Sequence, residues 1–260
     1  MGEAKIKSRS RAEILLGSPR CTYCTSTANE VEHMPPRAMF KGKQRPSGLE
    51  FPCCNNCNQG SKNADLVATF LSKISSNEDL GSWQLLDAIR YKTRIRSQVP
   101  GLLEEIFEDN SKITDVLFKS PRGLLTRGVQ IRADGPILRR NLDIFSAKLG
   151  MALFREHVGQ PVPEEGAVQS VWFLNAIPPQ TLQTFLNILP GFGMLEQGRK
   201  KSDGQFEYRY NTDNESILAS VSHFHNSIFI LNIACAGSWR RRIVSFEGNT
   251  SSWAELGAMA

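Results

Sequence analysis

Residues 21–65 read CTYCTSTANEVEHMPPRAMFKGKQRPSGLEFPCCNNCNQGSKNAD, and this stretch decides the fold of the first quarter of the chain. It contains two Cys-x-x-Cys pairs, Cys21 with Cys24 and Cys54 with Cys57. Two residues between thiolates let both sulfurs face one ion, and four thiolates complete the tetrahedral shell of Zn²⁺. Such a shell leaves no open position for a substrate, so we expect a structural zinc site made by these four cysteines.

Two further cysteines need a separate interpretation. Cys53 lies directly before the second pair and would be either a free neighbour or an alternative zinc ligand. The two-residue gap between Cys54 and Cys57 favours Cys54 as the ligand. Cys235 lies in an apolar segment, so we expect it to be a core residue.

Two short extended segments lie between the cysteine pairs. Residues 30–33 and residues 49–51 alternate polar and apolar side chains, and Pro52 should end the second segment. We therefore expect a hairpin whose loop covers residues 41–48. Beyond Cys57 we expect a helix, because apolar residues recur there at a spacing of four. Zinc would join the two ends of this small unit, since its core is too small to supply stability alone.

Glu32, His33 and Asn58 form the candidate site that the hairpin positions. Mg²⁺ prefers oxygen ligands, and Glu32 offers a carboxylate while Asn58 offers a carbonyl oxygen. His33 follows Glu32 along the strand, so its side chain points the other way and would act as a base on water. The cation would polarise a phosphate, which Arg37 or Lys62 would hold. The alternative for His33 is a polar residue satisfied by its neighbours.

These motifs, Cys-x-x-Cys, Glu-His-x-x-Pro and Cys-x-x-Cys-Asn with a following Lys, together resemble those of the HNH endonucleases of the ββα-metal fold, in the branch with a four-cysteine zinc site. The resemblance covers residues 21–65. It implies that His33 is the general base and that Glu32 and Asn58 ligate a catalytic Mg²⁺ or Mn²⁺. The implied activity is metal-dependent hydrolysis of phosphodiester bonds in nucleic acid, with DNA favoured over RNA.

Two positions depart from the family pattern. The middle Asn of the motif usually stands shortly before the second cysteine pair and supports the loop that carries the histidine, whereas residues 47–51 read Ser-Gly-Leu-Glu-Phe. The acidic residue is Glu rather than the commoner Asp, and its longer arm can still reach a metal. The missing Asn supports an alternative function, a catalytically inactive zinc-stapled module that binds nucleic acid or protein. The joint presence of Glu32, His33 and Asn58 argues for the enzyme.

The composition is typical of a globular protein, because 40% of the 260 residues are hydrophobic and 22% are charged. The apolar runs are too short for a membrane span, and no export signal is recognisable, so we expect a cytoplasmic protein with no membrane partner. The net charge is +5, and ten basic against six acidic residues place +4 of it in residues 1–65. This basic region is compatible with a nucleic-acid partner.

We expect an α+β fold with three regions. These are a basic N-terminal segment at residues 1–20, an HNH-like zinc module at residues 21–75 and an α+β domain at residues 76–260. The last region would bind nucleic acid, sense a signal or build a homo-oligomer, and the sequence does not choose among these roles. By analogy alone, the arrangement would suit bacterial restriction or defence.

Within the last region, hydrophobic periodicity separates helices from strands. Residues 78–120 read as mostly helical, and the alternating basic residues 90–96 fit either an exposed strand or a helix end. Residues 137–158 form the strongest amphipathic helix of the chain. The expected strands lie at residues 123–133, 168–174, 206–210, 216–221, 227–236 and 241–246.

Overall fold

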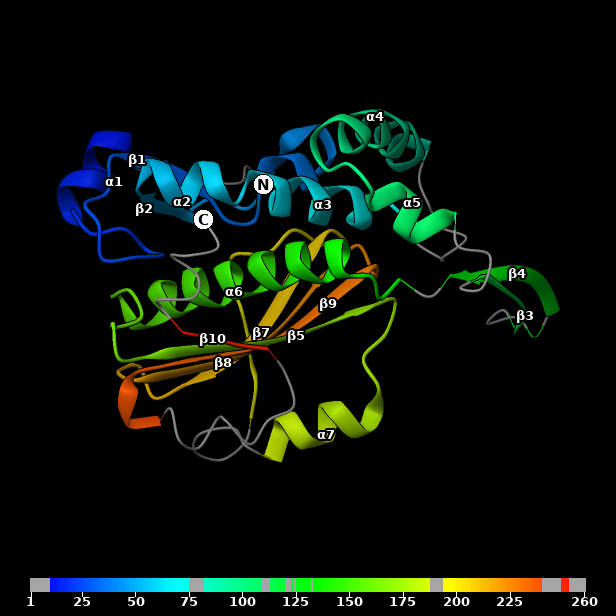
Figure 1. Ribbon diagram of the computed structural model, residues 1–260. Coiled ribbons are helices and arrows are strands. Elements are labelled where there is room, and N and C mark those ends of the chain that lie inside the picture. Colours follow the sequence, from blue (N-terminus) through cyan, green and yellow to red (C-terminus); the bar gives the residue numbers. More distant parts are fainter. Residues whose placement is uncertain are drawn as a thin grey trace, which may run out of the picture.

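The computed structural model describes residues 10–74, 82–108, 113–119, 123, 125–131, 133–187, 194–239 and 249–252. Within them the protein has the expected α+β class, and its elements stack in layers around one long helix, α6 (Figure 1). Among the described residues, no helix combines the length and the apolar character needed to cross a membrane.

A six-stranded antiparallel sheet forms one layer, with the strand order β10-β5-β9-β8-β7-β6. Side chains along β9 alternate between its faces, so that Ile228 and Ile230 join the main core while Leu231 and Ile233 join a second apolar cluster. The strands are β5 (Ala167–Leu174), β6 (Glu196–Gln197), β7 (Phe206–Thr212), β8 (Ile217–Phe224), β9 (Ile228–Cys235) and β10 (Asn249–Ser252), and a short 3-10 helix, η4 (Gly237–Trp239), follows β9.

Helix α6 (Pro136–Val158) lies on one face of this sheet and separates the sheet from the zinc module (Figure 1). Its apolar stripe is buried, as the periodicity predicts. Gly150 allows a close approach to the sheet, because a Cβ at this position would lie 3.0 Å from Asn232 and 3.1 Å from Val168. Gly159, with φ +83°, ends the helix in the left-handed conformation that glycine favours. The buried stripe includes Leu138, Leu142, Phe145, Leu149, Ala152 and Leu153.

Helix α7 (Pro179–Asn187) covers the opposite face of the sheet (Figure 1). Phe185 of this helix is fully buried in the second apolar cluster, where it joins Ala219 of β8 and Leu231 of β9. The sequence analysis did not predict this helix, because nine residues carry too few periods for a clear pattern.

The zinc module lies on the other side of α6, and its hairpin has the expected form. Strands β1 and β2 pair antiparallel, with Glu32 opposite Phe51 and His33 opposite Glu50. Helix α3 packs against α6. The elements of the module are α1 (Arg11–Gly17), β1 (Glu30–His33), the 3-10 helices η1 (Arg37–Met39) and η2 (Lys41–Lys43), β2 (Glu50–Cys53), α2 (Asn55–Gly60) and α3 (Lys62–Ser72).

Three local expectations within the module were wrong. Pro52 does not end the second strand but lies inside β2, where a two-stranded sheet has a free edge that needs no N–H donor. The helix after the second cysteine pair is broken at Ser61 into α2 and α3, so Asn58 and Lys62 lie on different helices. The helix also starts earlier than expected, because Cys54 caps its N-terminus.

Beyond the module, the structure resolves one ambiguity and corrects one prediction. Residues 90–96 belong to α4 (Ser82–Gln98), which is followed by α5 (Leu102–Phe107). Part of the region read as helical is instead the strand β3 (Ile113–Lys119), which pairs with β4 (Leu125–Ile131) in a separate hairpin. The strand expected at residues 241–246 lies outside the described residues, as do residues 1–9 of the basic N-terminal segment expected at residues 1–20.

One continuous core joins the zinc module to the sheet. Buried Phe51 of the hairpin, Phe145 of α6 and Phe206 of β7 belong to the same cluster of apolar side chains. The division into separate regions at residue 75 therefore stays a prediction, and the described parts on either side of it share their packing.

We expect Phe145→Ala to lower the free energy of unfolding by about 3–5 kcal/mol, because it removes a fully buried ring at the centre of this core. Chemical denaturation measures the change. Leu86→Ala, at a side chain of α4 that is 59% exposed, should stay within about 0.5 kcal/mol of the parent. Equal losses in both variants would contradict the placement of the core.

Candidate metal centre and catalytic cluster

The four cysteines of the two pairs come together as the sequence predicts. The sulfurs of Cys21, Cys24, Cys54 and Cys57 all lie within 4.8 Å of one another, which suits a tetrahedral shell around one Zn²⁺. In the part of the chain that the structure describes, no second group of three or more His, Cys, Asp or Glu ligand atoms is as compact.

Backbone N–H groups support the sulfurs of this centre. Cys21 Sγ accepts hydrogen bonds from the N–H groups of Tyr23 and Cys54, each at 3.3 Å, and Cys54 Sγ accepts from the N–H of Cys57 at 3.4 Å. The thiol of Cys57 and the N–H groups of Tyr23 and Cys54 outweigh burial and lower the pKa of Cys21 to about 5. These donors favour the thiolate, which is the form that binds a metal.

Cys53 behaves differently from its neighbour. Its side chain is fully buried in β2, and it is not part of the four-sulfur group. Burial, with the nearby negative charge of Glu32, raises the pKa of the Cys53 thiol well above its usual range. The four-sulfur group that could hold a metal therefore contains Cys54, as the spacing favoured, and Cys53 is a buried thiol outside it.

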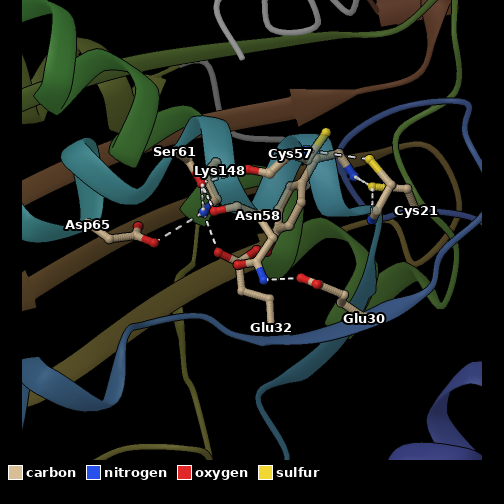
Figure 2. Close-up of polar contacts among 10 residues, drawn as sticks. Cys21, Glu30, Glu32, Cys57, Asn58, Ser61, Asp65 and Lys148 are labelled. Carbon is tan, nitrogen blue, oxygen red and sulfur yellow. Dashed lines mark hydrogen bonds and ion pairs between the residues drawn. The ribbon is translucent and has the colours of Figure 1, made fainter.

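Lys148 of α6 lies at the centre of the second cluster, which Figure 2 shows beside the zinc cysteines. Its Nζ forms an ion pair with Glu32 Oε1, donates to Ser61 Oγ at 2.6 Å and lies 3.4 Å from Asp65 Oδ2. The same Nζ is 5.2 Å from the ring centre of Tyr23, between Cys21 and Cys24. One ammonium group thus contacts the hairpin, α3 and the first cysteine pair.

The charges in this cluster are strongly coupled because they are buried. Burial alone would lower the pKa of Lys148, but the Asp65 and Glu32 carboxylates outweigh it and hold the pKa above its ordinary value. Burial also raises the pKa of Glu32 to about 7, with Lys148 opposing the shift and Asp65 adding to it. Lys148 therefore stays charged, and the two carboxyl groups share its single positive charge.

Asn58 does not join Lys148 or complete a ligand set with Glu32. Its side-chain amide donates to Glu30 Oε2, and Figure 2 shows it turned toward Glu30. Glu32 is 5% exposed, and its Oε1 already forms an ion pair with the Lys148 ammonium. As these side chains lie, they do not fit a divalent cation. The expected Mg²⁺ or Mn²⁺ site at Glu32 and Asn58 therefore remains a prediction that the structure does not support.

His33 lies apart from this cluster, because successive side chains of β1 point to opposite faces. It is half-buried, and Nδ1 has no hydrogen-bond partner among the described residues. Burial, together with the positive charges of Arg45 and Arg37, lowers the pKa of His33 to about 4, against the opposing effect of Glu50. The imidazole is therefore neutral at physiological pH.

Glu50 is a residue that the sequence analysis missed. It lies opposite His33, forms an ion pair with Arg45 and accepts a hydrogen bond from the N–H of Gly48 at 3.1 Å. These contacts brace the loop between β1 and β2.

The sequence analysis also did not identify Lys148, although one feature of the sequence pointed to it. It stands three residues after Phe145 and directly before Leu149, inside the apolar stripe of α6. A lysine at a buried helical position is unusual unless an anion lies opposite. The candidate phosphate ligands Arg37 and Lys62 are both exposed, Arg37 on η1 near His33 and Lys62 on α3.

Comparisons with protein-family models, with curated proteins and with solved structures find no match to this chain.

The first prediction from this geometry concerns the zinc centre. We expect the purified protein to hold a single zinc ion per chain and Cys54→Ala to lose it, because three remaining thiolates bind the metal far less tightly. Zinc content by mass spectrometry and thermal unfolding measure the effect.

Cys53→Ala is the matched control, since it removes a neighbouring thiol that lies outside the four-sulfur group. This variant should keep its zinc and differ from the parent only by the loss of a buried side chain. Loss of zinc from Cys53→Ala, with zinc retained in Cys54→Ala, would reassign the fourth ligand.

Proposed function

We propose that this protein is an HNH-type endonuclease that hydrolyses phosphodiester bonds in nucleic acid, with DNA as the preferred substrate. The supporting observation is the state of His33. It is a neutral, half-buried imidazole on a hairpin whose ends meet at the four-cysteine centre. A neutral imidazole next to bound phosphate is suited to remove a proton from water.

The surface around His33 supports a polyanionic partner. Arg37, Lys41 and Lys43 all lie exposed on the segment that follows β1. Exposed cations near a catalytic base bind backbone phosphates without reading the base sequence. Arg37 would hold the reacting phosphate, and the two lysines would contact its neighbours along the strand.

The reaction proposed for this site is a single displacement at phosphorus. His33 accepts a proton from the attacking water while the water oxygen forms its bond to phosphorus. The bond from phosphorus to the ester oxygen breaks, and the departing alkoxide takes a proton from solvent. The guanidinium of Arg37 stabilises the charge on the non-bridging oxygens. The proposed reaction uses no metal ion at Glu32, because Lys148 already pairs with that carboxylate.

The decisive test is cleavage by the parent protein and by His33→Ala. Plasmid DNA, single-stranded DNA and RNA are incubated with each protein, with and without added Mg²⁺ or Mn²⁺. We expect the parent to cut and His33→Ala to lose about 100-fold or more in rate, since general-base catalysis contributes at least that much. Gel electrophoresis of the products measures the rate.

His223→Ala serves as the control, because it removes a half-buried histidine of strand β8 in the six-stranded sheet, outside the hairpin that carries His33. This variant should cut at the parental rate. Equal cutting by the parent and His33→Ala, or no cutting by the parent on any substrate, would refute the proposal.

The pH dependence provides an independent check. Because the pKa of His33 is lowered to about 4, the imidazole stays unprotonated as the pH falls from 8 to 6, and the cleavage rate should hold nearly constant. A base with the ordinary pKa of 6.5 would lose about three quarters of its rate at pH 6. A decline of that size would contradict the environment assigned to His33.

A second candidate function is a zinc-stapled binding module without catalysis. The ion pair between Glu32 and Lys148 favours it, because a carboxylate that already carries a cation is not available to a metal. Under this alternative the parent and His33→Ala would both shift DNA in a gel and neither would cut it.

A further inference from the structure

The carboxylate of Glu32 is paired with a cation that the protein itself supplies, the ammonium of Lys148. The Lys148 ammonium lies between Glu32 and Asp65 and also donates to Ser61 Oγ. The contacts described for this ammonium are with oxygen atoms and with the ring of Tyr23. Carboxylate and hydroxyl oxygens are the ligands that a hard divalent cation prefers. The amine therefore stands where the ligand chemistry would favour Mg²⁺ or Mn²⁺.

Two oxygens of the cluster are not bonded to the Lys148 ammonium. Glu32 Oε2 and Asp65 Oδ1 are buried, and neither makes a hydrogen bond of ordinary length within the described residues. The ammonium thus reaches one oxygen of each carboxylate, and the Tyr23 hydroxyl also interacts with Glu32. A divalent ion in the same place would have more charge and could use these oxygens as ligands.

Lys148 is enclosed in this position, since its side chain is only 4% exposed. The neighbouring Leu149 is fully buried, and Arg155 on the same helix donates to the Arg20 carbonyl at 3.1 Å and to Thr22 Oγ1 at 2.9 Å. Helix α6 is thus fixed to the zinc module at two points along its length and packs on the sheet with its other side. The backbone that carries Lys148 is therefore held in place beside the cluster.

We propose that Lys148 permanently replaces the divalent cation at Glu32, so that the folded protein binds no Mg²⁺ or Mn²⁺ there and acquires such a site only when the amine is removed. The proposal rests on the geometry of the buried cluster and does not depend on nuclease activity. It makes one statement about that activity, namely that cleavage requires no metal ligated by Glu32.

The test is Mn²⁺ binding to the zinc-loaded protein, followed by electron paramagnetic resonance of the free ion. The parent should show no Mn²⁺ site that depends on Glu32. Lys148→Ala should bind a single Mn²⁺ per chain at least about tenfold more tightly than the parent, since two carboxylates then face an open space. The double variant Lys148→Ala with Glu32→Gln should lose that site.

Arg140→Ala is the matched control, because it removes an exposed positive charge from the same helix without touching the cluster. It should bind Mn²⁺ no better than the parent. An equal gain in Arg140→Ala would show that net charge alone is responsible and would overturn the proposal. A folded Lys148→Ala that gains no Mn²⁺ site would also overturn it.

Circular dichroism and zinc content establish whether each variant is folded. If Lys148→Ala does not fold, the parent and Glu32→Gln decide the question. An Mn²⁺ site in the parent that Glu32→Gln removes overturns the proposal, and the absence of such a site upholds it. The cleavage assay is read separately, so a parent that cuts DNA and binds Mn²⁺ through Glu32 would keep the proposed function and lose this inference.

Discussion

A buried ammonium group holds the zinc module against the rest of the protein. Lys148 reaches the hairpin through Glu32, the start of α3 through Ser61 and Asp65, and the first cysteine pair through Tyr23. Breaking a buried ion pair by removing one partner costs about 3–5 kcal/mol, because the other charge is left uncompensated. Loss of either partner would therefore weaken the contact between α6 and the hairpin.

Two cations would thus stabilise different parts of the module. Zinc, bound by thiolates, would join the two ends of the hairpin to each other, whereas Lys148, bound by carboxylates, joins the completed hairpin to α6. The consequence for chemistry follows from the pleat of β1. Glu32 is directed into the protein, where it serves stability, and His33 lies near the positive charges of Arg45 and Arg37.

Sequence patterns predicted the features that depend on local spacing, such as the four-cysteine centre, the hairpin and α6. They could not predict which groups meet in space. Lys148 is separated from Glu32 by 116 residues and from Asp65 by 83, and no periodicity identifies such partners. Glu32, His33 and Asn58 were recognised by type, yet their three different neighbours, Lys148, Arg45 and Glu30, come from tertiary structure. The short elements α7 and β3 were missed because few residues carry little periodicity.

The buried position of α6 limits how far the hairpin and its helices can be regarded as a portable unit. If residues 21–75 were grafted onto another scaffold, the cysteines would carry their metal centre with them. Glu32 and Asp65 would leave their counter-ion behind, since Lys148 belongs to a helix outside the graft. The same motif would then present two uncompensated carboxylates in its new host and a closed ion pair in this one. What Glu32 can do is thus decided by the helix beneath the motif rather than by the motif itself.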